Sequence, residues 1–170
     1  MRRKHWLYGL WACFLFLGIS ATFASDLPDH TLTPGSTNPN VTQDNINKTI
    51  CVSGWTKTIR PTTKYTNELK QEQIKEYGYK DKSPTSYEED HLISLQLGGH
   101  PTDPKNLWPE PYNTRCGARI KDVLETRLKK MVCANKISLA DAQQAIATDW
   151  ITAYKKYVHG GGCPFLEHEQ

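Results

Sequence analysis

The chain has 170 residues, enough for one domain with a tail and too few for several domains. It carries 21 Lys and Arg against 18 Asp and Glu, and three of the basic residues stand within the first four positions. Without those three the formal charge is zero, at 18 against 18. Overall charge therefore gives no argument for a nucleic-acid partner.

The N-terminus has the pattern of an export signal. Arg2, Arg3 and Lys4 precede the apolar run WLYGLWACFLFLGI, which is too short for a transmembrane span. The segment ATFA before Ser25 has the small-x-small shape of a cleavage site. We expect residues 1–24 to be a secretory signal peptide, with a retained signal anchor as the alternative. The mature protein is then secreted or periplasmic, with no membrane anchor.

Three segments follow the signal. Residues 25–49 are rich in Pro, Asn, Thr and Ser, so we expect a linker or an ordered coil outside the core. ICVSGWTKTIRP alternates loosely and is β-branched, which predicts a short strand that ends at Pro61. TNELKQEQIKEYGY predicts a helix, with Asn67 as a candidate N-cap and Gly78 as its end signal.

Two strands and a helix are predicted in the middle of the chain. YEEDHLISLQL reads as a strand that Gly98 and Gly99 break, and HPTDPK reads as a loop. NLWP predicts a second short strand, which Pro109 and Pro111 confine to a sheet edge or end. A helix is predicted from Gly117 onward. Its apolar stripe is Ile120, Val123, Leu124, Leu128, Met131 and Val132, and its polar side is Lys121, Asp122, Glu125 and Lys129.

A last helix is predicted to begin at Ser138, because Asp141 stands three residues later in capping-box spacing. Gly160, Gly161 and Gly162 are expected to end it. Its core-facing stripe is Leu139, Ala142, Ile146, Trp150, Ala153 and Tyr157.

The mature chain has four cysteines, and an even number in an exported protein predicts two disulfides. If one helix joins Cys116 to Cys133, the two lie roughly 25 Å apart, while a disulfide needs Cα atoms within about 7 Å. That pair is excluded, which leaves two pairings open. Of these we favour Cys51–Cys133 with Cys116–Cys163. No Cys-x-x-Cys occurs, which argues against a structural zinc site.

The adjacent Asp90 and His91 are the first candidates for chemistry. A carboxylate is an oxygen ligand that a hard divalent cation prefers, and a neutral imidazole can take a proton from water. A basic stretch, Arg115 to Lys130, follows an acidic one, Ser83 to Glu110, and this pairing suits a metal and a phosphate. A solvated helix face is the alternative. Neighbours on a regular strand point to opposite faces, so Asp90 and His91 cannot both face one point. Either the strand bends there, or the two side chains act from different sides of a bound phosphate.

The order DHLISLQLGG, NLWP and a helix resembles the HNH endonuclease motif of the His-Me finger (ββα-metal) nucleases. That pattern has Asp-His, a loop often containing Gly-Gly, an Asn usually followed by Leu, and a helix carrying a third polar ligand. The likeness covers residues 86–125, with Ser94 where the family often has Pro. The flanking segments ICVSGWTKTIRP and SLADAQQAIATDWITAY resemble small exported bacterial proteins with an HNH-like core.

The resemblance implies a role for each matched residue. His91 corresponds to the general base that activates water, and Asp90 to the metal ligand. Asn106 corresponds to the Asn that braces the loop through backbone hydrogen bonds, so that the catalytic His is aimed. Gly98 and Gly99 match the loop glycines.

The third metal ligand stays open. Asn113 is nearest to the family's spacing, and Asp122 and Glu125 are rivals on the helix. Arg119 and Lys121 are candidate contacts for the phosphate backbone of a substrate. His100, in the loop, is a further candidate substrate contact.

We therefore expect an α+β fold with a ββα-metal (HNH-like) core over residues 50–160, additional helices, disulfide ties and a C-terminal tail over residues 161–170. The expected activity is metal-dependent endonucleolytic cleavage of DNA, with RNA as a second candidate and Mg²⁺ as the first candidate cofactor. The alternative is a non-catalytic exported binding or structural module with a degenerate HNH scaffold. The lack of an obvious third ligand favours that alternative.

Overall fold

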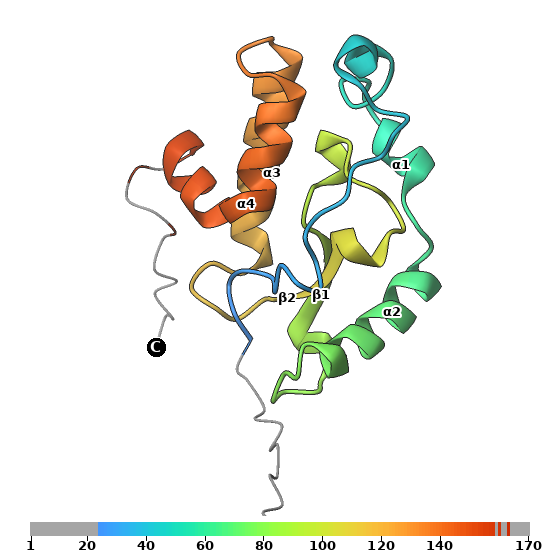
Figure 1. Cartoon of the computed structure of the whole chain (residues 1–170), viewed down its shortest axis with the longest axis vertical. Coiled ribbons are helices and arrows are strands. Elements are labelled where there is room, and N and C mark those ends of the chain that lie inside the picture. Colours follow the sequence, from blue (N-terminus) through green and yellow to red (C-terminus); the bar gives the residue numbers. More distant parts are fainter. Residues whose placement is uncertain (1–23, 159, 161–162, 164–170) are drawn as a thin grey trace, which may run out of the picture.

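The structure is a computed structural model that describes residues 24–158, 160 and 163. A two-stranded sheet lies at its centre (Figure 1). Helix α2 (Thr63–Glu76) lies on one side of it, and helices α3 (Ala118–Cys133) and α4 (Leu139–Tyr157) lie on the other. The chain is thus α+β. The predicted signal peptide lies outside the described residues apart from Ala24, and the predicted tail lies outside them apart from Cys163.

The central sheet is an antiparallel hairpin of β1 (Tyr87–His91) and β2 (Leu107–Pro111), in which Tyr87 pairs with Pro111 and His91 with Leu107. Both predicted strands exist. The first is shorter than YEEDHLISLQL, because the Ser94 hydroxyl caps a 3₁₀ turn, Leu95–Leu97, by accepting from the Gln96 amide. The two prolines of β2 are tolerated because each strand of a two-stranded sheet is an edge.

The strand predicted for ICVSGWTKTIRP is wrong. Its second half forms the short helix α1 (Trp55–Ile59), which begins directly after Gly54. Gly54 has φ +78, a left-handed conformation that turns the chain instead of extending it. Loose β-branched alternation favours a strand only where another strand is available for pairing.

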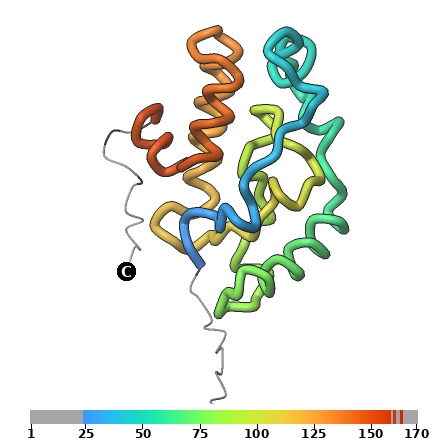
Figure 2. The backbone as a smooth tube through the Cα atoms, in the orientation of Figure 1, coloured from blue at the N-terminus to red at the C-terminus, as the bar shows by residue number. Residues whose placement is uncertain are grey.

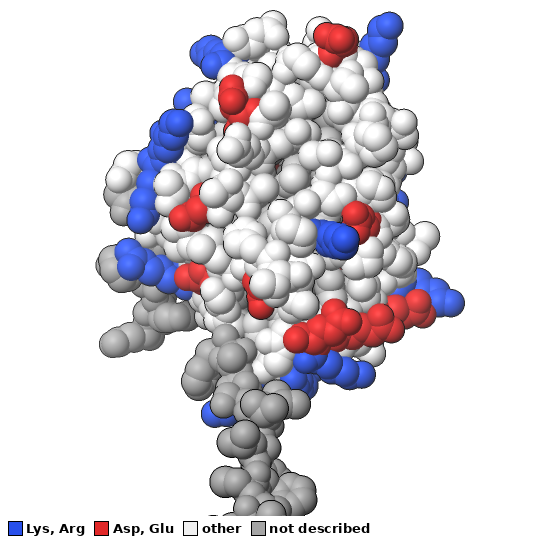
Figure 3. Space-filling view, viewed as in Figure 1, with Lys and Arg blue, Asp and Glu red and all other residues white. Residues whose placement is uncertain are grey.

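The helix predicted for TNELKQEQIKEYGY is confirmed as α2 (Thr63–Glu76). It begins four residues before the candidate cap Asn67, because Thr62 caps it by accepting from the Tyr65 amide. Figure 3 shows acidic side chains gathered over α2. They include three exposed glutamates at four-residue spacing, Glu68, Glu72 and Glu76.

The helix predicted after Gly117 is confirmed as α3 (Ala118–Cys133), but its inward face is rotated from the predicted one. Val123, assigned to the apolar stripe, is 48% exposed, whereas Lys121 and Glu125, assigned to the polar side, are buried. Helical periodicity treats charged residues as solvent-facing, whereas these two are buried because they pair with each other. This rotation directs α3's own charged groups at the sheet.

The last helix, α4 (Leu139–Tyr157), begins as predicted, with the Ser138 hydroxyl accepting from the Asp141 amide. It has a kink at Asp149, whose φ and ψ of −162° and 94° are not helical. The Asp149 carboxylate restarts the helix by accepting from the Thr152 amide and hydroxyl. Most of the predicted stripe is buried, including Ile146 and Trp150.

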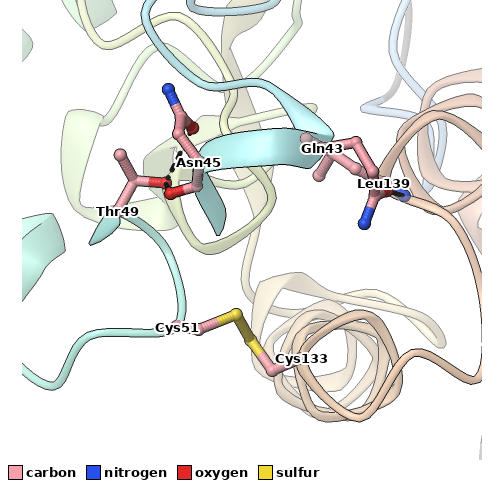
Figure 4. Close-up of a disulfide and its surroundings, with 6 residues drawn as sticks. All are labelled: Gln43, Asn45, Thr49, Cys51, Cys133 and Leu139. Atoms are coloured by element: carbon pink, nitrogen blue, oxygen red, sulfur yellow. Dashed lines mark hydrogen bonds between the residues drawn. A yellow bond between two sulfur atoms is a disulfide. The ribbon is translucent and has the colours of Figure 1, made fainter. Parts of the chain in front are cut away.

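The N-terminal segment is an ordered coil and not a linker. It runs between the two groups of helices (Figure 2), and Val41, Ile46 and the following Ile50 belong to the core. The expectation that residues 25–49 lie outside the core is therefore wrong. Its Gln43 side chain accepts from the Leu139 amide at 2.7 Å, next to the Cys51–Cys133 disulfide (Figure 4).

The favoured disulfide pairing is confirmed. Cys51 and Cys133 have Cα atoms 5.6 Å apart, and Cys116 and Cys163 have Cα atoms 5.5 Å apart. Two disulfides indicate an oxidising compartment. None of the helices in the described part of the chain combines the length and apolarity that a bilayer crossing requires.

Candidate active site

The site lies at the end of β1, where Asp90 and His91 are adjacent. The side chains of strand neighbours point to opposite faces of a sheet. Asp90 points toward α3, where its carboxylate meets Lys121, and His91 shares the α2-facing side of the hairpin with Glu89. The two residues therefore act from opposite faces of the same strand end.

His91 is buried and held in one orientation. The residue is 6% exposed, and its Nε2 lies 2.9 Å from the carbonyl oxygen of Pro101. Since a carbonyl only accepts, Nε2 carries the proton and Nδ1 keeps a lone pair. Nδ1 has no hydrogen-bond partner among the described residues. It is not completely buried either, so water can reach it.

Burial lowers the pKa of His91, and the hydrogen bond to Pro101 offsets this only in part. The imidazole is therefore neutral at pH 7, which is the form that accepts a proton. A neutral, oriented imidazole with one nitrogen open to water has the properties of a general base.

Asn106 joins the two ends of the loop after His91. Its Oδ1 accepts from the amides of Ile93 (3.0 Å) and Ser36 (3.3 Å). Its Nδ2 donates to the carbonyls of Ile93 (3.0 Å) and His100 (3.1 Å). The side chain is fully buried, and all four of these groups belong to the backbone. The bracing geometry that the resemblance implies is thus present at Asn106.

Glycine is required in the same loop for two different reasons. A Cβ at Gly99 would lie 1.6 Å from the carbonyl oxygen of Ile93. Gly98 has φ +72, which ends the 3₁₀ turn in the left-handed region. The imidazole of His100 also stays within the loop, where Nδ1 accepts from the amides of Thr102 and Asp103.

We predict that Asn106→Asp lowers the free energy of unfolding by about 2–4 kcal/mol, because two buried carbonyls lose their donor and a carboxylate takes its place. Chemical denaturation of both proteins measures this. Asn67→Asp, at an exposed position on α2, is the matched control and should shift the midpoint little. An unchanged midpoint for Asn106→Asp would show that the loop does not depend on this amide.

The other face of the strand end is an ion-pair network centred on Lys121. Its ammonium donates to Asp90 Oδ2 at 2.5 Å, to Glu125 Oε1 at 2.6 Å and to the carbonyl of His91 at 2.9 Å. Glu125 also accepts from the Ser94 hydroxyl at 2.7 Å. The Lys121 side chain is 1% exposed and that of Asp90 is 15% exposed. All three N–H donors of this buried ammonium are therefore used.

Acidic groups outnumber the one ammonium. We define the carboxylate cluster as Asp90 and the four carboxyl groups of the hairpin and α3 whose pKa its charge raises, namely Glu88, Glu110, Glu125 and the exposed Asp122. Glu88 and Glu110 are direct cross-strand partners, where like charges repel. Both carboxylate oxygens of Glu110 are buried, and neither has a hydrogen-bond partner among the residues that the structure describes.

The pKa values in the carboxylate cluster reflect this surplus. Burial raises the pKa of Glu110 well above its ordinary value, and the charge of Asp90 raises it further. Burial also raises the pKa values of Glu88, Asp122 and Glu125. For Lys121, burial lowers the pKa, but Asp90 and Glu125 outweigh burial and raise it above its ordinary value. The ammonium therefore stays charged while part of the cluster stays protonated.

Asn113, the third oxygen donor expected beside Asp90, lies near the other end of the hairpin. Asn113 is exposed and lies beyond Pro111, which pairs with Tyr87 at the far end of the hairpin. That end is three residue steps along β1 from Asp90, roughly 10 Å at the usual rise. Glu125, named as a rival, is the residue that α3 brings near: because both contact Lys121 Nζ, its Oε1 and Asp90 Oδ2 are at most 5.1 Å apart.

No observation here tests Mg²⁺ itself, but the position between Asp90 and Glu125 does not suit a divalent cation. The point between Asp90 and Glu125 is taken by the Lys121 ammonium. Within the described part of the chain, no group of three or more His, Cys, Asp or Glu side chains is arranged to hold a metal ion. Mg²⁺ therefore stays a prediction.

The two candidate phosphate contacts on α3 differ in access. Arg119 is exposed and close to Tyr112, whereas Lys121 is inside the protein and has no free donor. Arg60, just after α1, is exposed, and its charge acts on both His91 and Asp122. Arg60 was missed because its neighbours are distant in sequence, but the four-residue spacing of Lys121 and Glu125 was a visible sign of their pairing.

Comparisons with known proteins returned no match: no family model, no curated protein and no solved structure is similar to this chain. The chemistry of the site is therefore inferred from its own geometry.

Proposed function

We propose that this chain hydrolyses phosphodiester bonds in nucleic acid, DNA first and RNA as a second candidate, with His91 as the general base. One observation carries the proposal: His91 is neutral, held through Nε2 by the Pro101 carbonyl, and open to water at Nδ1. The strand–loop–strand–helix order and the bracing by Asn106 add support through the resemblance to HNH nucleases.

In the proposed reaction, Nδ1 of His91 takes a proton from a water molecule as that water attacks the phosphorus. The bond from phosphorus to the leaving oxygen breaks, and that oxygen takes a proton from solvent. Arg60, which is exposed and whose charge reaches His91, holds the phosphate next to the base, and Arg119, which is exposed beside Tyr112 at the other end of the hairpin, holds the phosphate backbone further along. Asn106 acts only through the loop, by keeping His91 aimed.

We predict that the mature protein nicks supercoiled plasmid DNA and that His91→Ala lowers the rate by about 10²–10⁴-fold, the usual contribution of a general base. The assay is run with Mg²⁺ and with EDTA. His30→Ala, an exposed histidine in the N-terminal coil, is the matched control and should cut at the wild-type rate. Cutting that survives His91→Ala would remove His91 from the mechanism.

A second candidate function has its own support. Asp90 is already neutralised by Lys121, and His91 is 6% exposed, as expected of a scaffold that binds without cutting. A non-catalytic exported binding or structural module would show no nicking with any divalent ion or with EDTA. Filter binding of labelled DNA then separates a nucleic-acid binder from a structural module.

A further inference from the structure

We infer that Lys121 gives this site a built-in cation, which occupies the point between Asp90 and Glu125 where a divalent ion would bind. A role of Lys121 in catalysis rests on the proposed function, whereas the inference that Lys121 blocks ion binding does not. The ammonium lies 2.5 Å from Asp90 Oδ2 and 2.6 Å from Glu125 Oε1. The distances match the roughly 2.3–2.6 Å between Ca²⁺ and carboxylate oxygens and exceed the roughly 2.0–2.1 Å of Mg²⁺. For either ion, one position cannot hold both the ion and the ammonium.

The position is closed as well as filled. Lys121 is fully buried, so an incoming ion would have to expel a charged side chain from the interior. The expelled ammonium would lose three hydrogen bonds at once, to Asp90, to Glu125 and to the His91 carbonyl. Its charge is also maintained, since the surrounding carboxylates raise the pKa of Lys121.

Lys121 also connects the carboxylate face to the base. Its bond to the His91 carbonyl, 2.9 Å long, holds the backbone from which the imidazole projects. Asn106 holds the following loop by the Ile93 amide and carbonyl. Lys121 is therefore a positioning residue for His91, and it touches no substrate.

The test is Mn²⁺ binding, followed by the EPR signal of the free ion, for the whole mature chain. We expect the wild type and Asp90→Asn to bind the same amount of Mn²⁺, because the wild type holds no ion at Asp90. Lys121→Met keeps the length of the side chain without its charge, and it is expected to gain one Mn²⁺ site that the added change Glu125→Gln abolishes. A wild-type site that Asp90→Asn removes would overturn the inference. A folded Lys121→Met protein without Mn²⁺ affinity would also overturn it.

If Lys121→Met does not fold, the comparison of the wild type with Asp90→Asn decides alone. Plasmid nicking provides a separate result: activity of the wild type that persists in EDTA is expected, and Lys121→Arg should retain more of it than Lys121→Met. EDTA-sensitive nicking restored by Mn²⁺, with Mn²⁺ bound at Asp90, would overturn the inference while leaving the proposed hydrolysis intact. Inactivity of every protein, with the Mn²⁺ results as expected, would instead reject the proposed function alone.

Discussion

Replacement of Lys121 by methionine is expected to lower the free energy of unfolding by about 3–5 kcal/mol at pH 7.5, the usual cost of breaking a buried ion pair from one side. The change removes the ammonium that pairs with Asp90 and Glu125 and leaves their carboxylates in the interior. Urea denaturation, followed by the intrinsic tryptophan fluorescence, measures the loss.

The loss at Lys121 is also expected to shrink as the pH falls. Lys121 lowers the pKa of Glu125, so without the ammonium that pKa rises further above its ordinary value, and the stability of the variant is greatest at low pH and declines as the pH rises. Lys130→Met, at an exposed position on the same helix, is the control and should change stability little. A midpoint for Lys121→Met equal to that of the control would contradict the buried network.

Replacement of Glu89 by glutamine is expected to stabilise the protein by about 2–4 kcal/mol at pH 8. Burial raises the pKa of Glu89 to about 9, and the charge of Lys70 reduces that rise only in part. Within the described part of the chain, neither oxygen of its carboxyl has a hydrogen-bond partner. The folded protein therefore keeps this group protonated at a pH where the unfolded chain releases the proton.

The sign of the pH dependence follows from the raised pKa. The stability that Glu89 contributes is complete below its ordinary value of 4.5 and is lost as the pH rises toward about 9. Glu89→Gln removes this loss, so the two proteins should be equally stable near pH 4 and should diverge above it. Glu72→Gln, at an exposed site on α2, is the control and should follow the wild type. Parallel curves for Glu89→Gln and the wild type would show that Glu89 is ionised in the fold.

The sequence was informative where a local pattern decides the structure. Strand, loop, strand and helix follow in the predicted order, because Gly98, Gly99 and the two prolines of β2 act on the backbone nearby. The cap at Ser138 is equally local. Cys116 precedes α3 and Cys133 ends it, so the length of that helix excluded one disulfide pairing by geometry alone.

The sequence was least informative where the structure depends on contacts between residues far apart in the chain. Lys121 reads as a surface residue in a helical repeat, and only the approach of the hairpin to α3 makes its burial favourable. Arg60 comes near His91 through the path of α1, which local propensity mistook for a strand. The charge repulsion at Glu110 cannot be read from the sequence, because it depends on the cross-strand partner Glu88.

The two faces of β1 have different roles in the site. On one face of β1 the imidazole of His91 is oriented and left with one open nitrogen, and on the other face Lys121 neutralises Asp90 and holds the His91 carbonyl. The Lys121 ammonium thus contacts the backbone of the same residue that supplies the base. We expect changes on the Lys121 face to alter the rate through the position of His91 rather than through its pKa alone.

The protonation of His91 tests the proposed base most directly, because it needs no substrate. Long-range ¹H–¹⁵N NMR of the mature protein at pH 7 reports which ring nitrogen carries the proton, with His91→Ala used to assign the signal. We expect a neutral ring with the proton on Nε2, a bare Nδ1, and titration below the ordinary histidine value of 6.5. A proton on Nδ1 at pH 7, or a doubly protonated ring, would contradict this expectation.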